Sequence, residues 1–186
     1  MSTKIYDNIV RLYGAKALRK SAMNIRKGAG VIEWAMKGKG FRRAVEIGTY
    51  RGCATAEIAQ YCDQVVTMDL VDGKLELIDN DYKWDRYAFW RSLNVNNVVF
   101  CSILNNEEKR VLLEETEFDF AFIDGDHTRA GIELDFELVK KCGHVLFHDA
   151  DDNGPNKPND VFEFISTLPK DQVVFKDIFA LWTAPV

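Results

Sequence analysis

Acidic and imidazole side chains follow two short apolar runs of this sequence. After residues 118–123 come Asp124, Asp126 and His127, and after residues 144–147 come His148 and Asp149. Carboxylates and imidazoles are the groups that bind divalent cations and transfer protons in proteins. If both runs are parallel strands, their carboxyl ends lie at one edge of a sheet, and these side chains gather there. The pattern therefore predicts a site for metal or proton-transfer chemistry.

A turn with two glycines, Gly48-Thr-Tyr-Arg-Gly52, follows another apolar run at residues 44–47. Gly48 permits a tight exit from a strand and a close approach of the backbone to a ligand, and Gly52 lets the next helix start against the sheet. The turn has neither the G-x-G-x-x-G fingerprint of dinucleotide sites nor the Gly-Lys-Ser/Thr of a phosphate-binding loop. A diphosphate is therefore not the expected ligand.

Two carboxylates indicate which charge the ligand carries. Glu46 lies just before Gly48 in an apolar run, where an isolated buried carboxylate is costly unless it meets a cation. Asp69 ends the next apolar run 23 positions after Glu46, close to the offset of about 20 at which an acid reaches ribose hydroxyls. A cationic nucleoside such as S-adenosylmethionine (SAM) fits both. The competing interpretation is an ordinary turn with two solvent-facing acids.

Short apolar runs that alternate with helical stretches are typical of an α/β fold with parallel strands and right-handed crossovers. The expected strands are residues 44–47, 64–68, 97–101, 118–123, 144–147, 173–175 and 179–182. The expected helices are residues 53–61, 82–93, 107–114, 128–140 and 160–168. The link at 176–178 is too short for a parallel crossover, so the last two strands are predicted to be antiparallel.

Apolar residues at helical spacing also precede the first strand, over residues 5–13 and 31–36, with Gly28-Ala-Gly30 expected to break the helix between them. The predicted fold is thus a Rossmann-like, doubly wound, mostly parallel seven-stranded sheet with an antiparallel C-terminal strand pair and an N-terminal helical cap. We expect one domain over residues 1–186, with the cap at 1–40 and the core at 41–186.

The composition narrows the class of protein. A chain of 186 residues with 47% hydrophobic residues can bury one sizeable core. No apolar run approaches the ~20 residues of a membrane span, and the start has no signal-like stretch, which favours a cytoplasmic protein. Four scattered cysteines without a CxxC pair suggest neither a zinc site nor a disulfide framework. The net charge of -5 argues against nucleic acid as a partner.

This charge is unevenly distributed. Residues 1–43 carry eleven basic side chains against Asp7 and Glu33, a balance of +9 that leaves -14 for the rest of the chain. One interpretation is a solvated helical face on an acidic body. The other is a patch that attracts an anionic acceptor molecule, with Arg42 and Arg43 taking part.

Four motifs, in this order, resemble the class I SAM-dependent methyltransferases, and most of all a small O-methyltransferase-like branch with IDGDH and HD after the fourth and fifth strands. They are Val45-Glu-Ile-Gly-Thr-Tyr-Arg-Gly52, Met68-Asp69, Phe118-Asp-Phe-Ala-Phe-Ile-Asp-Gly-Asp-His127 and Gly143-His-Val-Leu-Phe-His-Asp149. The resemblance runs from about residue 41 to the end. It implies that SAM is the cofactor, with the methionine part near Glu46, Gly48 and Gly52, the ribose near Asp69 and the adenine near Ser102 and Ile103. Thr49 and Asp124 are further expected cofactor-binding residues.

The resemblance also implies methyl transfer to a hydroxyl of a small molecule. In the metal-dependent enzymes of this kind, Asp124 and Asp149 match metal ligands, and His127 matches the base. Catechol-type enzymes have asparagine where this chain has Ala150, so His148, Asp151 or Asp152 remain alternatives as a further ligand. Mg²⁺ suits an oxygen-rich site, and a transition metal suits one in which His148 is a ligand.

Several alternatives stay open. His127 is otherwise a helix-start residue beside Asp126 as N-cap, and the chain is otherwise a SAM-binding protein without activity or a nucleotide-dependent oxidoreductase on a similar fold. Four aromatic residues either line an acceptor pocket or pack in the core: Tyr50, Trp84, Trp90 and Trp182. His144 should face away from the site. Because few residues are left to cover the acceptor, a homodimer is predicted.

Overall fold

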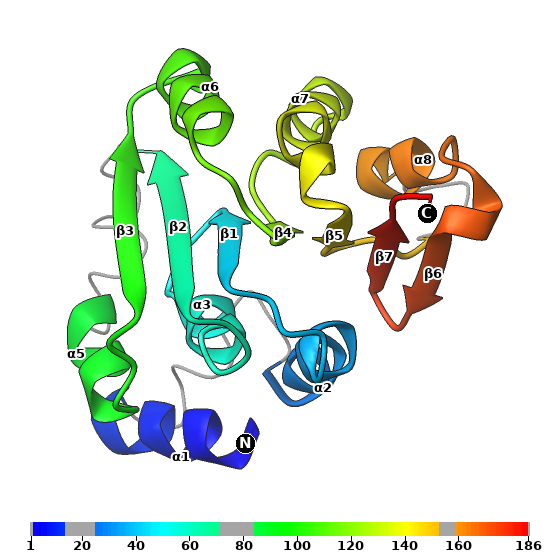
Figure 1. Cartoon of the computed structure of the whole chain (residues 1–186). Coiled ribbons are helices and arrows are strands. Elements are labelled where there is room, and N and C mark those ends of the chain that lie inside the picture. Colours follow the sequence, from blue (N-terminus) through cyan, green and yellow to red (C-terminus); the bar gives the residue numbers. More distant parts are fainter. Residues whose placement is uncertain (1, 14–24, 71–83, 153–158, 186) are drawn as a thin grey trace.

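A seven-stranded mixed sheet forms the centre of the protein, with the strand order β3-β2-β1-β4-β5-β7-β6 (Figure 1). The computed structural model describes residues 2–13, 25–70, 84–152 and 159–185. Its strands are β1 (Arg43–Ile47), β2 (Gln64–Leu70), β3 (Val98–Ile103), β4 (Phe120–Ile123), β5 (His144–Phe147), β6 (Val173–Lys176) and β7 (Phe179–Thr183). The first five strands are parallel, and β7 runs antiparallel to both β5 and β6. The predicted sheet and its antiparallel final pair are confirmed.

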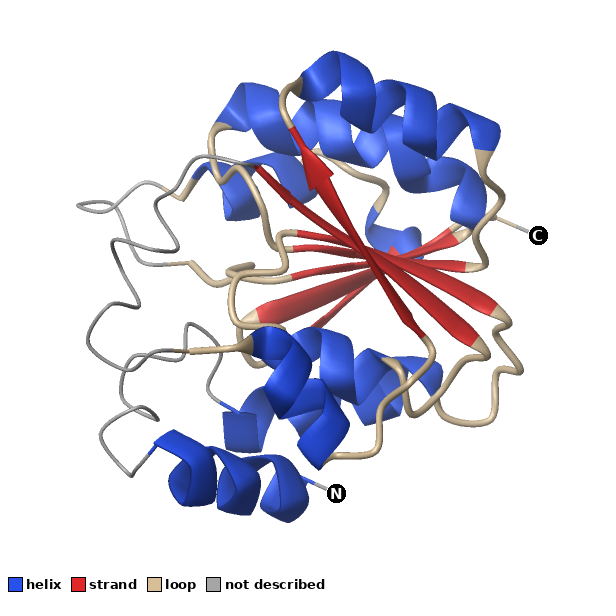
Figure 2. Cartoon of the chain, turned by 90° about the vertical axis from the view of Figure 1, so that its left-hand side faces the viewer, coloured by secondary structure: helices blue, strands red, loops and turns tan. Residues whose placement is uncertain are grey.

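Helices cover both faces of this sheet (Figure 2). One layer consists of α1 (Ser2–Tyr13), α2 (Ile25–Met36), α3 (Cys53–Ile58) and α5 (Arg86–Ser92), and the other of α6 (Asn106–Glu115), α7 (Arg129–Val139) and α8 (Asp160–Ile165). Short 3-10 turns, η2 (Lys140–Cys142) and η3 (Lys170–Gln172), precede β5 and β6. Because both faces are covered, the inner strands are mostly apolar, and all four residues of β4 are apolar and buried.

Two hydrophobic clusters lie on the two sides of the sheet. Ile9 and Ile32 pack with Phe120 and Phe122 on one side. Ile132, Phe136, Val45 and Phe147 belong to the cluster on the other side. Alternate residues of β1 and β4 face opposite clusters, which fixes the register of the two central strands.

The two N-terminal helices complete a helical layer. Ile5 and Ile9 of α1 and Val31 and Ile32 of α2 are fully buried in the same cluster as α3. The prediction that Gly28-Ala-Gly30 breaks the helix is wrong, because α2 runs through both glycines. Gly28 is buried, and α2 packs on both α1 and α3, so tertiary contacts outweigh the ~1 kcal/mol helical penalty of each glycine.

Helix ends differ from the predictions by a few residues. The helix predicted at 53–61 ends at Ile58, and that predicted at 160–168 ends at Ile165. Residues 82 and 83 of the third predicted helix lie outside the described residues. The assignment of Asp126 as a possible N-cap is wrong, because Thr128 caps α7 by accepting a hydrogen bond from Gly131 N at 3.2 Å. Asp126 instead accepts one from Thr128 N at 3.0 Å.

Two further predictions concern the chain as a whole. All four cysteines lie within the described residues and form no disulfide. Among the helices of the described residues, none combines the length and the hydropathy that a membrane span needs.

Candidate active site

The strand order reverses between β1 and β4, and a doubly wound sheet binds its ligand at the carboxyl ends of such a pair. The two turns that leave these strands are in direct contact. Asp124 N donates a hydrogen bond to Ile47 O at 2.9 Å, and Gly48 N donates one to Met68 O at 2.9 Å. We call residues 48–52 the first turn and residues 124–127 the second turn. Their contact makes this edge the candidate site.

The first turn requires glycine at its start. Gly48 has a φ of +96°, and a Cβ placed there would lie 2.1 Å from Asp124 O in the second turn. No other residue fits that conformation and that space. The glycine predicted to allow close backbone approach therefore also lets the two turns touch.

Two indoles support the first turn from the side of α5. Trp90 Nε1 donates to Gly52 O at 2.8 Å, and Trp84 Nε1 donates to Arg51 O at 3.0 Å. Trp90 is buried, whereas Trp84 is half-buried and stacks on Tyr13 with ring centroids 4.0 Å apart. Both rings also pack with the hydrophobic cluster on this side of the sheet, as the core interpretation predicted, and their N–H groups hold the first turn.

Trp182 has no such role. It packs in the cluster on the opposite side of the sheet, and its Nε1 donates to Gln172 Oε1 at 2.9 Å. The core interpretation of this residue is therefore the one the structure supports.

Glu46 is completely buried, and its carboxyl group meets hydroxyl groups of two other elements. Its Oε2 accepts hydrogen bonds from Thr55 of α3 and Thr67 of β2. Thr67 also lies 2.6 Å from the hydroxyl of Thr49, so that Thr49 donates to Thr67 while Thr67 donates to Glu46. Burial, opposed by these hydrogen bonds, raises the pKa of Glu46 to about 8. The carboxyl group is thus protonated at neutral pH, which removes the need for a counter-ion.

The threonine pair was not visible in the sequence pattern, because Thr55 and Thr67 lie on a helix and a strand that meet only in the fold. Among the described residues, Glu46 Oε1 has no hydrogen-bond partner. Thr49 is buried as well, so its hydroxyl belongs to this network beneath the first turn.

Asp69 and Ser102 lie side by side at the same edge of the sheet, since they are register partners of β2 and β3. Asp69 Oδ2 accepts a hydrogen bond from Tyr50 N at 2.7 Å. Tyr50 has a φ of +43°, a backbone conformation that residues other than glycine rarely adopt. The predicted ribose carboxylate therefore also holds the first turn in its shape.

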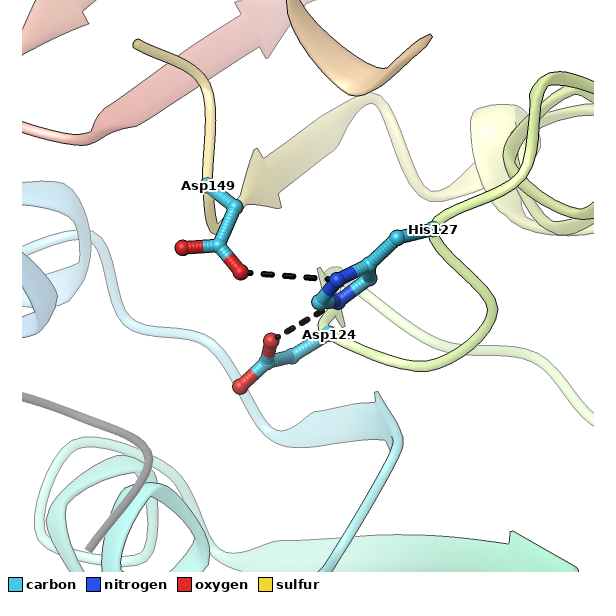
Figure 3. Close-up of side chains that lie close together, drawn as sticks. All are labelled: Asp124, His127 and Asp149. Atoms are coloured by element: carbon cyan, nitrogen blue, oxygen red, sulfur yellow. Dashed lines mark ion pairs between the residues drawn. The ribbon is translucent and has the colours of Figure 1, made fainter. Parts of the chain in front are cut away.

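His127 lies between two carboxylates at the carboxyl edge, as Figure 3 shows. Its Nε2 is 3.4 Å from Asp124 Oδ1, and its Nδ1 is 3.5 Å from Asp149 Oδ2. One ligand atom from each of these three residues lies within 4.8 Å of the other two. The second turn supplies Asp124 and His127, and the end of β5 supplies Asp149. The fold thus brings together the three residues that the sequence predicted as metal ligands and base.

His148 lies behind this cluster and is almost fully buried. Its Nδ1 is 3.1 Å from Asp124 Oδ1 and 3.2 Å from Asp149 Oδ1, and its ring packs edge-on against Phe179. Burial lowers its pKa, but the two carboxylates outweigh that effect and raise it to about 10. His148 is therefore positively charged at neutral pH and attracts both Asp124 and Asp149.

The pKa values of Asp124 and His127 are also shifted toward the charged form of each group. Burial opposes ionisation of Asp124, but the neighbouring imidazoles of His127 and His148 hold its pKa below the ordinary value. The carboxylate of Asp124 beside His127 raises the pKa of that imidazole, against the effect of burial. The site therefore stabilises positive charge between two carboxylates.

The backbone after β5 is fixed by a residue that the sequence analysis missed. Asn159 Nδ2 donates to Asp149 O at 2.7 Å and to Asp151 O at 2.9 Å, while its Oδ1 caps α8. Asp149 has a φ of +52°, and Ala150 is buried with its N–H donating to Ile178 O at 2.8 Å. An asparagine directly before a helical apolar stretch was the available signal.

Three basic or imidazole side chains lie at the opposite edge. Arg42 and Arg43 are at the amino end of β1, and a strand of five residues spans roughly 16 Å. These two arginines therefore lie about one strand length from the carboxyl edge, and the predicted attraction of an anionic acceptor would act over that distance. His144, at the amino end of β5, lines a separate cavity of about 560 Å³ with Phe41 and Lys141. The prediction that it faces away from the site is confirmed.

Comparisons with known proteins agree with this geometry. A family model described as a methyltransferase domain matches residues 45–150, more than half of the chain. A comparison with curated proteins finds no match.

Solved structures share the fold at low sequence identity. An O-methyltransferase from Bacillus cereus in complex with S-adenosylhomocysteine (SAH) is 19% identical, with a TM-score of 0.66 and coverage of 98% of this chain and 91% of that one. The O-methyltransferase TomG from Streptomyces achromogenes, in complex with SAM, is 17% identical, with a TM-score of 0.67 and coverage of 99% and 89%. The SAH-bound methyltransferase PaMTH1 from Podospora anserina is 16% identical, with a TM-score of 0.63 and coverage of 99% and 88%. The edge where the first and second turns meet lies within the matched residues, and the chain belongs to the methyltransferase domain family.

Proposed function

We propose that this protein is a SAM-dependent methyltransferase that acts on a hydroxyl oxygen of a small molecule, with help from a divalent cation. The observation that carries the proposal is the contact between the two turns: the glycine turn abuts Asp124, whose carboxylate pairs with His127. A nucleoside site and an acid–base site are thereby adjacent. Family membership and the SAM- and SAH-bound O-methyltransferases of similar fold support the same reaction.

The cofactor site in this proposal is the carboxyl edge of β1 to β3. In this proposal the methionine part lies along the first turn, near Gly48 and Gly52 and the Asp124 carboxylate. Asp69 and Ser102 are register neighbours placed for the ribose and the adenine. Glu46 and Thr49 act from below, through their hydrogen-bonded network.

The donor set fits a divalent cation. Asp124 and Asp149 offer carboxylate oxygens, and His127 offers a nitrogen within the same 4.8 Å. The carboxylates raise the pKa of His127 and His148, so a cation would occupy a position that already favours positive charge. Asp124 and Asp149 would hold it, and His148, once it has lost its proton on arrival of the cation, would be the further ligand that the sequence left open. When bound, such an ion lowers the pKa of a coordinated hydroxyl.

The protein's own groups then perform the proton chemistry. When bound, SAM supplies an electrophilic methyl group on its sulfonium. His127 accepts the proton of the acceptor hydroxyl as the new C–O bond forms and the C–S bond breaks. Asp124 and Asp149 orient the imidazole from both sides, and the half-exposed position of His127 leaves it accessible to an acceptor.

Binding and activity test the proposal separately. Calorimetry and thermal shift with SAM, SAH and NAD, each with and without Mg²⁺ and Mn²⁺, test the cofactor; stabilisation by NAD alone would contradict it. Once an acceptor is found, His127→Ala should lower turnover about 10²- to 10⁴-fold while SAH still binds. His144→Ala is the matched control, because His144 lies at the opposite edge. If His127→Ala keeps full turnover, His127 is not the base.

Three further predictions accompany this function. The acceptor is anionic and is attracted by the basic residues of the N-terminal segment, which charge reversal at Arg42 and Arg43 would test through the acceptor KM; Lys16, Arg19 and Lys20 of that segment lie outside the described residues. The enzyme is cytoplasmic. It forms a homodimer, which sedimentation analysis would test.

A further inference from the structure

An ion pair is buried between α6 and α7, outside the cluster of Asp124, His127 and Asp149. Lys109 Nζ donates to Asp135 Oδ1, and the two side chains are only 6% and 0% exposed. Moving both charges out of water is expensive, and apolar residues of similar size are often equally stable or better. Stability alone is therefore a weak reason for this pair.

The second oxygen of Asp135 faces the second turn. Asp135 Oδ2 is buried and has no hydrogen-bond partner among the described residues. A Cβ placed on Gly125 would lie 3.6 Å from this oxygen and 3.1 Å from Ile47 Cγ2. Gly125 is thus enclosed between the end of β1 and the carboxylate that Lys109 holds.

A second contact links the same helix to the same turn. A Cβ placed on Gly131 would lie 2.3–2.6 Å from the Asp126 side chain. Gly131 and Asp135 are four residues apart, one helical turn of α7, and therefore face the second turn together. The second turn rests on α7 at both Gly125 and Asp126.

We propose that Lys109 and Asp135 are positioning residues of the methyltransferase site: the ammonium fixes the Asp135 carboxylate, which sets the height of Gly125 and so aligns Asp124 and His127 with the first turn. This inference rests on the proposed function. A displacement of Gly125 reaches the cofactor side directly, because Asp124 N is bonded to Ile47 O and Asp124 O lies against Gly48. Lys109 and Asp135 themselves touch no reacting group.

A variant that removes the charges but keeps the packing separates positioning from stability. Lys109→Met with Asp135→Leu should melt at or above the wild-type temperature, yet bind SAH about tenfold more weakly. The matched control is Lys140→Met with Glu137→Gln, which removes an exposed pair at the end of the same helix region. The control should change neither the melting temperature nor the SAH affinity.

The outcomes are distinct. If the wild-type protein does not bind SAH, the proposed function fails. If the wild type and the folded double variant bind SAH equally, the positioning role is overturned. Should the double variant not fold, Asp135→Ala replaces it, since the shortened side chain no longer reaches Gly125 or Lys109; unchanged SAH affinity of that variant would likewise overturn the role.

Discussion

The protonated carboxyl group of Glu46 makes a prediction that needs no knowledge of the acceptor. Replacing it by glutamine in Glu46→Gln keeps the shape and one oxygen for the Thr55 and Thr67 hydroxyls. The amide does not titrate. The variant should therefore lose the dependence of stability on pH that Glu46 brings to the wild type.

The sign and size follow from the pKa of this group. In the unfolded chain Glu46 loses its proton near 4.5, whereas in the folded chain burial keeps it bound until about pH 8. The folded state binds the extra proton between these values, so its stability falls as pH rises through that window. At ~1.4 kcal/mol per pH unit, the separation between 4.5 and about 8 amounts to about 5 kcal/mol, lost in full above pH 8.

Urea unfolding of both proteins from pH 5 to pH 9 measures this difference. The free energy of unfolding of Glu46→Gln minus that of the wild type should rise with pH by about 4 kcal/mol over this range and level off above pH 8. His127 and His148 titrate in both proteins, so their contribution cancels. Glu33→Gln is the control, because Lys37 holds the pKa of exposed Glu33 below its ordinary value and the residue stays ionised throughout. A difference that stays constant from pH 5 to pH 9 would refute the buried, protonated carboxyl.

Three other changes give measurable outcomes. In urea unfolding, Gly48→Ala should lower the free energy of unfolding by about 1–3 kcal/mol, because Gly48 has a φ of +96° and lies against Asp124 O. Gly30→Ala is the control: its new methyl group meets open space within α2, so the free energy of unfolding should rise by about 0.5–1 kcal/mol. If both alanines behave alike, the close contact of the two turns is not real. Trp90→Phe removes the hydrogen bond to Gly52 O, and should cost about 1 kcal/mol together with some SAH affinity, as calorimetry would detect; undiminished SAH affinity would separate Trp90 from the cofactor turn. Asp149→Asn should weaken Mn²⁺ binding, measured by electron paramagnetic resonance, while Asp152→Asn should not; equal binding by both would place the cation elsewhere.

Much of the fold was predictable because its signals are local. Apolar runs of strand length alternate with helical stretches, and the three-residue link at 176–178 excludes a parallel crossover between the last strands. Strand order follows from these units, since right-handed crossovers leave few arrangements. The predicted break at Gly28 and Gly30 was wrong because α2 is stabilised by packing on α1 and α3, and helix propensities do not include such tertiary contacts.

The site divides in the same way. Asp124, His127 and Asp149 were predictable because each follows a strand, and parallel strands in one sheet end at one edge. The position of the basic side chains relative to this edge was not predicted in this way. Arg42 and Arg43 belong to the basic segment but lie at the far edge, because a strand separates its two ends by its own length.

By itself, the sequence determined which residues stand at strand ends and therefore which edge carries the chemistry. Only the tertiary structure decided what surrounds them. Glu46 meets Thr55 and Thr67 from other elements, Trp84 and Trp90 hold the first turn across more than thirty residues, and Asn159 fixes the backbone of Asp149. Each of these contacts joins residues of different elements, and hydrogen bonds and burial depend on their distance in space, which no spacing along the chain records.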